Sequence, residues 1–181
     1  MNNCFAADII SPLSLTNSTL YANYTVRSVI NSSLLLINAS QVKITVKAGN
    51  LDTMKIASMY IGHAAASGDP YDFDGNQVQM LFSGSAAVSV LVNESVTSDT
   101  ITFSLDKTKN LVISIYYATD SSRTAFNTIT NIDGYQNDTG DESGVTNPAS
   151  GWYNNGYCFS VTNITDGITA AAPSSRVIFI E

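Results

Sequence analysis

The chain has 181 residues, enough for one domain with a full core, and its 44% hydrophobic content excludes a disordered polymer. The net charge is −7 with only eight Lys and Arg, which excludes a cationic nucleic-acid-binding face and disfavours an anionic membrane surface. No run of eighteen apolar residues occurs, so we expect no transmembrane helix and no membrane partner.

Short runs with apolar residues at alternate positions dominate the chain as far as residue 117. A period of two is typical of strands with one buried and one solvated face. The pattern predicts strands over 24–30, 41–47, 54–61, 78–82, 87–92, 100–105 and 111–117. The last run is the most apolar, so we place it at the centre of a sheet.

Residues 118–151 differ, because turn-forming and acidic residues crowd there. We expect a long loop excursion, since strand-like sequence resumes at 157–161, and loops of this length are usually functional or held by a partner. Strands at roughly ten-residue spacing, with no helical stripe, predict a single all-β domain over 1–181. The expected architecture is an antiparallel, jelly-roll-like β-sandwich.

The two cysteines, Cys4 and Cys158, lie near opposite ends of the sequence. They could form one long-range disulfide, or remain buried thiols that act as small hydrophobic side chains. With the single histidine, His63, they match no zinc-site spacing.

One segment is a candidate metal site. Asp72, Asp74 and Asn76 occupy alternate positions around Gly75, as do the first ligands of a calcium loop. The distal Glu of such loops is absent, and Asp-Gly stretches also form plain turns. Calcium is therefore the one candidate cofactor, and the alternative is that no cofactor is bound.

Aromatic residues gather in and just after the excursion. Aromatic faces beside Asn and Asp could stack on a sugar, or these side chains could cover the end of the sandwich. The candidate sugar-binding residues are Tyr135, Trp152, Tyr153 and Tyr157.

Six segments occur in a recognisable order: TVRSVI at 25–30, QVKITV at 41–46, IASMYI at 56–61, LFSGSAAV at 81–88, VTSDTI at 96–101 and LVISIYY at 111–117. This set resembles the non-catalytic β-sandwich module that precedes the catalytic domain in secreted SGNH/GDSL-type hydrolases. The resemblance covers about residues 24–117 and implies a sandwich fold. The run at 176–181 looks like the lead-in to the catalytic strand of that family.

The catalytic motifs of the family do not occur in the sequence: it contains no Gly-Asp-Ser, no Gly-x-Ser-x-Gly and no Asp-x-x-His. His63 lies mid-chain with no partner suggested nearby. We therefore expect that the protein is not an enzyme.

The expected function is that of a non-enzymatic structural or adhesive protein. We expect a bacteriophage virion component, a capsid decoration or tail-associated module that contacts other virion proteins or its own copies. Three features favour this hypothesis: the catalytic half of the SGNH/GDSL-type hydrolases is missing, residues 1–8 do not read as an export signal, and the composition is polar with few charges. The alternative is an extracellular carbohydrate-binding module, free-standing or cut from a larger glycan-active hydrolase, that binds cell-surface glycan.

Overall fold

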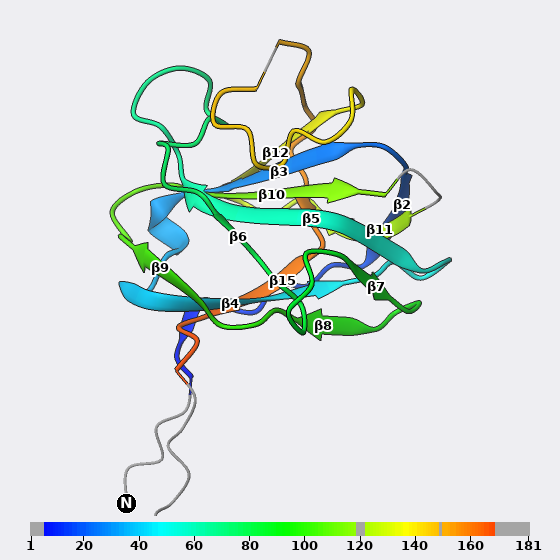
Figure 1. The fold of residues 1–181 in the computed structure, drawn as a ribbon, viewed down its shortest axis with the longest axis horizontal. Helices are drawn as coiled ribbons and strands as arrows, with labels where there is room; N and C mark the ends of the chain where they lie inside the picture. The colour runs from blue at the N-terminus through cyan, green and yellow to red at the C-terminus, as the bar shows by residue number, and fades with distance from the viewer. Residues whose placement is uncertain (1–5, 119–121, 149, 169–181) are drawn as a thin grey trace, which may run out of the picture.

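The structure, a computed structural model, describes residues 6–118, 122–148 and 150–168, which form antiparallel sheets packed as a sandwich (Figure 1). The predicted all-β fold class and antiparallel sandwich are confirmed. The jelly-roll topology is not established by the strand orders and stays a prediction. Cys4 and the run at 176–181 lie outside the described residues.

The first sheet has five strands. Its order is β1–β15–β4–β8, and β9 also pairs with β4. The bounds are β1 (Asp8–Ile10), β15 (Val161–Thr165), β4 (Ala39–Lys47), β8 (Ser95–Thr97) and β9 (Ile101–Leu105). The alternation in β4 gives the predicted buried and solvated faces. Val42, Ile44 and Val46 are fully buried, whereas Lys43 and Lys47 are half-buried.

The second sheet has seven strands, in the order β13–β12–β3–β10–β5–β6, with β7 also paired to β5. The bounds are β13 (Tyr153–Asn154), β12 (Ile132–Asn137), β3 (Thr25–Ile30), β10 (Leu111–Tyr117), β5 (Met54–His63), β6 (Val78–Gln79) and β7 (Val88–Val90). β10 lies between β3 and β5, which confirms its predicted central position.

A smaller sheet of three strands lies near the end of the sandwich where β5 begins (Figure 1). Its strands are β14 (Cys158–Phe159), β11 (Ser122–Asn127) and β2 (Asn17–Tyr21). A single 3-10 turn, η1 (Ser32–Leu34), follows β3, and the Asn31 side chain caps it by accepting a hydrogen bond from the Ser33 N–H.

The main hydrophobic core lies between the two larger sheets. It joins the inward side chains of β4, such as Ile44, to those of β10 and β5, such as Ile113, Ile115 and Ile61. A second, smaller core lies on the outer face of the seven-stranded sheet and consists of Val29, Tyr71, Phe73, Val112 and Tyr135. β3 and β10 are therefore buried on both faces, and every residue of β3 is buried.

Two segments form what we call the loop cover: residues 64–77, and residues 138–148 with 150–152. They lie over the outer face of the seven-stranded sheet (Figure 1). The Phe73 N–H donates to the Thr146 carbonyl at 3.0 Å, and the Ser58 hydroxyl of β5 donates to Asp141 at 3.0 Å. The two segments are thus bonded to each other and to the sheet beneath.

The predicted excursion at 118–151 is wrong in part, because it contains two strands. β11 pairs with β2, and β12 pairs with β3 along its whole length. The residues from 138 to 148 contain no strand and fold back over the sheet, where the carbonyls of Glu142 and Val145 accept hydrogen bonds from Arg27 of β3. Nothing in the described part of the chain is a helix of the length and hydrophobicity that crossing a bilayer requires.

Candidate functional site

Arg27, in the middle of β3 on the outer face of the sheet, donates four side-chain hydrogen bonds. It is fully buried. Its Nε donates to the Ser114 hydroxyl at 3.2 Å and its Nη1 to the Tyr71 carbonyl at 2.7 Å. Its Nη2 donates to the carbonyls of Glu142 at 3.0 Å and Val145 at 2.5 Å. One guanidinium therefore ties both segments of the loop cover to the sheet.

The environment of Arg27 explains how a buried cation is tolerated. Burial lowers its pKa to about 10, and the carboxylates of Asp72 and Glu142 oppose this shift. The guanidinium also lies 4.5 Å from the ring centroid of Phe73 and 5.2 Å from that of Trp152. Cation–π attraction and four hydrogen bonds thus offset the cost of desolvation, and Arg27 stays charged at neutral pH.

Two of the four candidate sugar-binding residues belong to this cluster. Trp152 stacks on Tyr71, with ring centroids 5.1 Å apart and planes 22° apart, and Tyr135 packs on the same tyrosine at 4.9 Å. Tyr135 is 8% exposed and Trp152 is half-buried. Their faces pack against protein, which is the covering role that the sequence analysis weighed against sugar binding.

The other two candidates lie outside this cluster, and their surroundings differ. Tyr157 packs against Phe126 and Phe159, at ring distances of 4.7 and 6.1 Å, at the edge of the main core. Tyr153 lies on β13, opposite Gln136 of β12, and is 68% exposed. The structure therefore gathers no four-residue aromatic platform, and Tyr153 alone among the four presents its ring to solvent.

His63 is the centre of a second polar cluster, at the end of β5. It is 2% exposed. Its Nε2 accepts a hydrogen bond from the Asp106 N–H at 3.0 Å, so this nitrogen carries no proton. Its Nδ1 lies 3.3 Å from Asn76 Nδ2 and 3.9 Å from Asp74 Oδ2, and its ring packs 5.1 Å from Phe103. Burial lowers the pKa of His63, while Asp74 opposes the shift.

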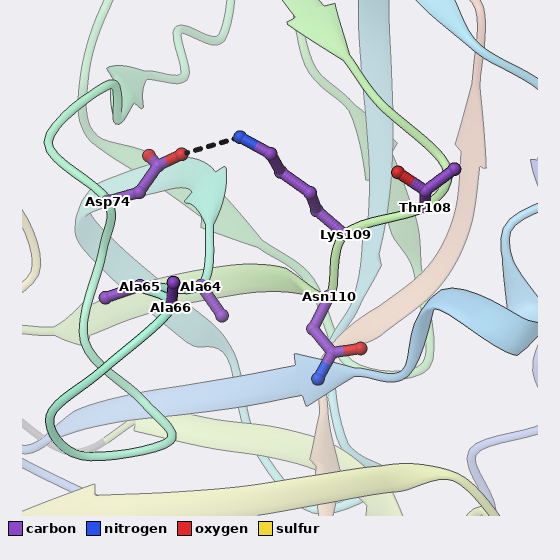
Figure 2. Close-up of a pocket in the computed structure, with 7 residues that line it drawn as sticks. All are labelled: Ala64, Ala65, Ala66, Asp74, Thr108, Lys109 and Asn110. Atoms are coloured by element: carbon purple, nitrogen blue, oxygen red, sulfur yellow. Dashed lines mark ion pairs between the residues drawn. The ribbon is translucent and has the colours of Figure 1, made fainter.

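Beside His63 is an open surface pocket of about 320 Å³ (Figure 2). Asp74 and Lys109 face each other across it, with Nζ and Oδ2 3.6 Å apart. The lining residues are Ala64, Ala65, Ala66, Asp74, Thr108, Lys109 and Asn110. The Asp74–Lys109 ion pair links the loop cover to the turn that precedes β10.

The three candidate calcium ligands engage different partners. Asp72 is buried, and its Oδ2 accepts from the Asp69 N–H at 3.0 Å. Asp74 pairs with Lys109, and Asn76 bonds to the backbone and ring of His63. Within the described ranges, no three His, Cys, Asp or Glu side chains gather as a metal-binding group. The calcium prediction gains no support from this arrangement.

Cys158 is a free thiol, fully buried, whose Sγ donates to the Val161 carbonyl at 3.7 Å. Burial raises its pKa to about 12. Its proposed disulfide partner, Cys4, lies outside the described residues, so the pairing stays a prediction.

Arg27, Tyr71 and the His63–Asp106 contact were not singled out from the sequence. Arg27 carried a signal, because a lone arginine inside the apolar run at 25–30 implies either an exposed face or a buried cation with partners. The partners themselves come from segments more than forty residues away, which no local pattern identifies.

No protein-family model matches the chain, and no curated protein matches it. The resemblance to the SGNH/GDSL accessory module therefore rests on the six sequence segments alone.

Proposed function

We propose that this protein is a non-enzymatic structural module of a virion, a capsid decoration or tail-associated protein of a bacteriophage that acts through protein–protein contacts. The observation that carries the proposal is a group of exposed apolar side chains at one end of the sandwich. We call this group the apolar end: Leu20, Leu51, Leu91 and Val92.

The members of the apolar end come from neighbouring segments. The turn at 91–94 packs on the turn after β4, because the Asn93 N–H donates to the Gly49 carbonyl and the Ala48 N–H to the Glu94 carbonyl, both at 3.0 Å. Leu51 follows in the same turn as Gly49. Leu91 and Leu51 are 67% and 66% exposed.

Leu20 joins this surface through β11. It pairs with Arg123, whose carbonyl accepts from the Gly49 N–H at 2.8 Å and whose N–H donates to the Thr53 carbonyl at 3.2 Å. Single exposed apolar residues are ordinary, but a group of them marks an interaction surface. The low charge of the chain supports the same proposal, because charged residues are depleted at interface centres.

The experiment is to purify particles of the phage whose genome carries this sequence and to measure the copies of the protein per particle by quantitative mass spectrometry. We expect a fixed copy number that survives gradient purification. The double variant Leu51→Asp/Leu91→Asp should be lost from particles, while Val145→Asp, which changes an exposed apolar residue of the loop cover, should be retained. Finding the protein only in the unbound fraction would overturn the proposal.

One observation favours the alternative, a carbohydrate-binding module: Tyr153 presents an exposed ring next to the exposed Asn154 on β13. A glycan array tests this directly. Binding that is lost in Tyr153→Ala and kept in Leu91→Asp would establish the alternative in place of the virion proposal.

A further inference from the structure

Two buried polar atoms in the cluster around Arg27 have no hydrogen-bond partner among the described residues: Asp72 Oδ1 and Trp152 Nε1. Asp72 is 6% exposed, and its other oxygen, Oδ2, accepts from the Asp69 N–H at 3.0 Å. An ionised carboxylate only accepts hydrogen bonds and an indole N–H only donates them. Buried polar groups of folded proteins are almost always bonded, either to protein or to ordered water. A partner is therefore expected for both atoms.

Arg27 adds a third group with unused bonding capacity. A guanidinium carries five N–H donors, and Arg27 donates four hydrogen bonds to described residues. Its Nε makes one of these bonds and its Nη2 makes two. The fifth donor is therefore on Nη1, whose other N–H bonds to the Tyr71 carbonyl at 2.7 Å.

The three groups meet around Tyr71. Asp72 follows this residue directly in the sequence, and the Tyr71 ring stacks on Trp152 at 5.1 Å. The guanidinium carbon of Arg27 lies 5.2 Å from the centroid of the Trp152 ring. Burial lowers the pKa of Arg27, and Asp72 is the carboxylate that opposes this shift most. The two charges thus act on each other, although no hydrogen bond joins them.

We propose that ordered water is bound in this cluster and joins the carboxylate of Asp72 to the guanidinium of Arg27 and the indole N–H of Trp152. Water donates to Asp72 Oδ1 and accepts from Nη1 and Nε1. A buried water molecule typically makes about three hydrogen bonds to polar groups that the protein leaves unpaired, which is what these three groups offer. This inference goes beyond the proposed function and does not depend on it.

The charges at the site favour water over an ion. A cation would be repelled by Arg27 and an anion by Asp72, whereas a neutral molecule that both donates and accepts satisfies both. The two unpaired atoms are also shielded from bulk solvent, which favours the smallest such molecule. Water-mediated hydrogen bonds are nearly as favourable as direct ones. Because Asp72 and Trp152 belong to the two segments of the loop cover, the bound water would link both segments to β3.

The first test observes the indole proton of Trp152 by NMR. Trp152 is the only tryptophan of the chain, so this proton gives a single resonance in the ¹⁵N-labelled full chain. The spectra are recorded in a buffer without glycerol or sugar, so that water is the only hydroxyl-bearing solvent. We expect cross-peaks to water of opposite sign in NOE and ROE spectra, which identify water that stays bound while the protein tumbles. Exchange of the proton with bulk water gives the same sign in both spectra.

A set of carboxylate variants tests the part played by Asp72. Asp72→Ala removes the acceptor, so the water cross-peak should be lost and the indole proton should exchange about tenfold faster or more. Asp72→Asn keeps an oxygen at the same position and should retain the cross-peak. Asp69→Ala is the matched control, because it removes a neighbouring carboxylate and leaves the backbone N–H that bonds to Asp72. Circular dichroism verifies that each variant is folded.

A crystal structure of the full chain that resolves ordered water gives the second test. Density for water should lie within hydrogen-bond distance of Asp72 Oδ1 and of Arg27 Nη1 or Trp152 Nε1. The inference is overturned by a direct bond from Arg27 or Trp152 to Asp72 Oδ1, by an ion at this place, or by an indole proton that shows exchange alone. Equal loss of the cross-peak in Asp69→Ala and Asp72→Ala would also overturn it. None of these outcomes bears on the apolar end.

Discussion

The Nη1 nitrogen of Arg27 donates a hydrogen bond to the backbone carbonyl of Tyr71 at 2.7 Å, across 44 residues of sequence. This contact joins the central region of the seven-stranded sheet to the loop cover. The same guanidinium holds the second segment of the cover through Glu142 and Val145. A single buried side chain thus organises the layer that makes β3 buried on both faces.

Replacing Arg27 with Ala should destabilise the protein by about 3–5 kcal/mol, because buried carbonyl groups lose their donor and a cavity remains. Arg27→Lys should recover part of this loss only, since an ammonium cannot reproduce the planar set of donors. Urea unfolding measures the change, and limited proteolysis should cut within 138–148 first. A free energy of unfolding within about 0.5 kcal/mol of wild type would contradict the role assigned to Arg27.

His63 makes the stability of the protein depend on pH. Its pKa in the folded protein is lowered from 6.5, chiefly by burial, so the unfolded chain binds the proton more readily. The stabilisation is therefore complete above the unfolded pKa and is lost as the pH falls below it. A proton on Nε2 would also break the bond from the Asp106 N–H.

The measurement is the free energy of unfolding between about pH 7.5 and pH 5 for wild type and for His63→Gln, which does not titrate. Wild type should lose stability more steeply than the variant as the pH falls. Asp74, Asp106 and Lys109 are the charged groups that act on His63, and all three remain in the variant. Parallel pH profiles for the two proteins would rule out this account of His63.

Two adjacent tyrosines of β10 allow a buried and a surface hydroxyl to be compared by the same substitution. The Tyr117 hydroxyl is fully buried and bonds to Thr124 at 2.8 Å and Ser160 at 2.7 Å, whereas the Tyr116 hydroxyl bonds to Asn23 at the surface. Tyr117→Phe should cost about 1–3 kcal/mol, because the buried hydroxyls of the network lose a partner. Tyr116→Phe should change stability by less than about 0.5 kcal/mol. Equal effects of the two substitutions in thermal or urea unfolding would argue against the network.

Cys158 should be inert in the folded protein. It is fully buried, and burial raises its pKa to about 12, so almost no thiolate is present at pH 8. In a Cys4→Ser variant, Ellman's reagent should react with Cys158 only after denaturant is added. Reaction of the folded variant at the rate of a small thiol would show that Cys158 is accessible.

The strands that the sequence predicts well are those with an unbroken alternation and one partly solvated face. β4 is the clearest case, because Val42, Ile44 and Val46 all point into the main core. The central position of β10 followed from its continuous apolar run, which is typical of a strand buried on both faces. The predicted strand at 78–82 is much shorter in the structure, where β6 covers only Val78–Gln79.

β12 escaped prediction because its sequence contains Asp133-Gly134, a dipeptide typical of turns. The glycine is required for a different reason. A Cβ atom at Gly134 would lie 2.0 Å from the Tyr157 carbonyl oxygen, so only glycine allows the two segments to approach. The partner segment is more than twenty residues away, and the local sequence carries no sign of it.

The partners of the candidate site residues also come from distant segments, which the local sequence does not identify. Aromatic composition identified Trp152 and Tyr135 but could not indicate that both pack on Tyr71, since that contact depends on how the loop cover folds over the sheet. Alternating acids identified Asp72 and Asp74 but not their separate partners.

The measurement that tests the assembly proposal most directly is hydrogen–deuterium exchange of the free protein against the protein in purified particles. The account predicts that protection on assembly concentrates in the turns at 49–53 and 91–94, which carry the apolar end. Protection confined to the segment around Tyr153, or no protection at these turns, would contradict it.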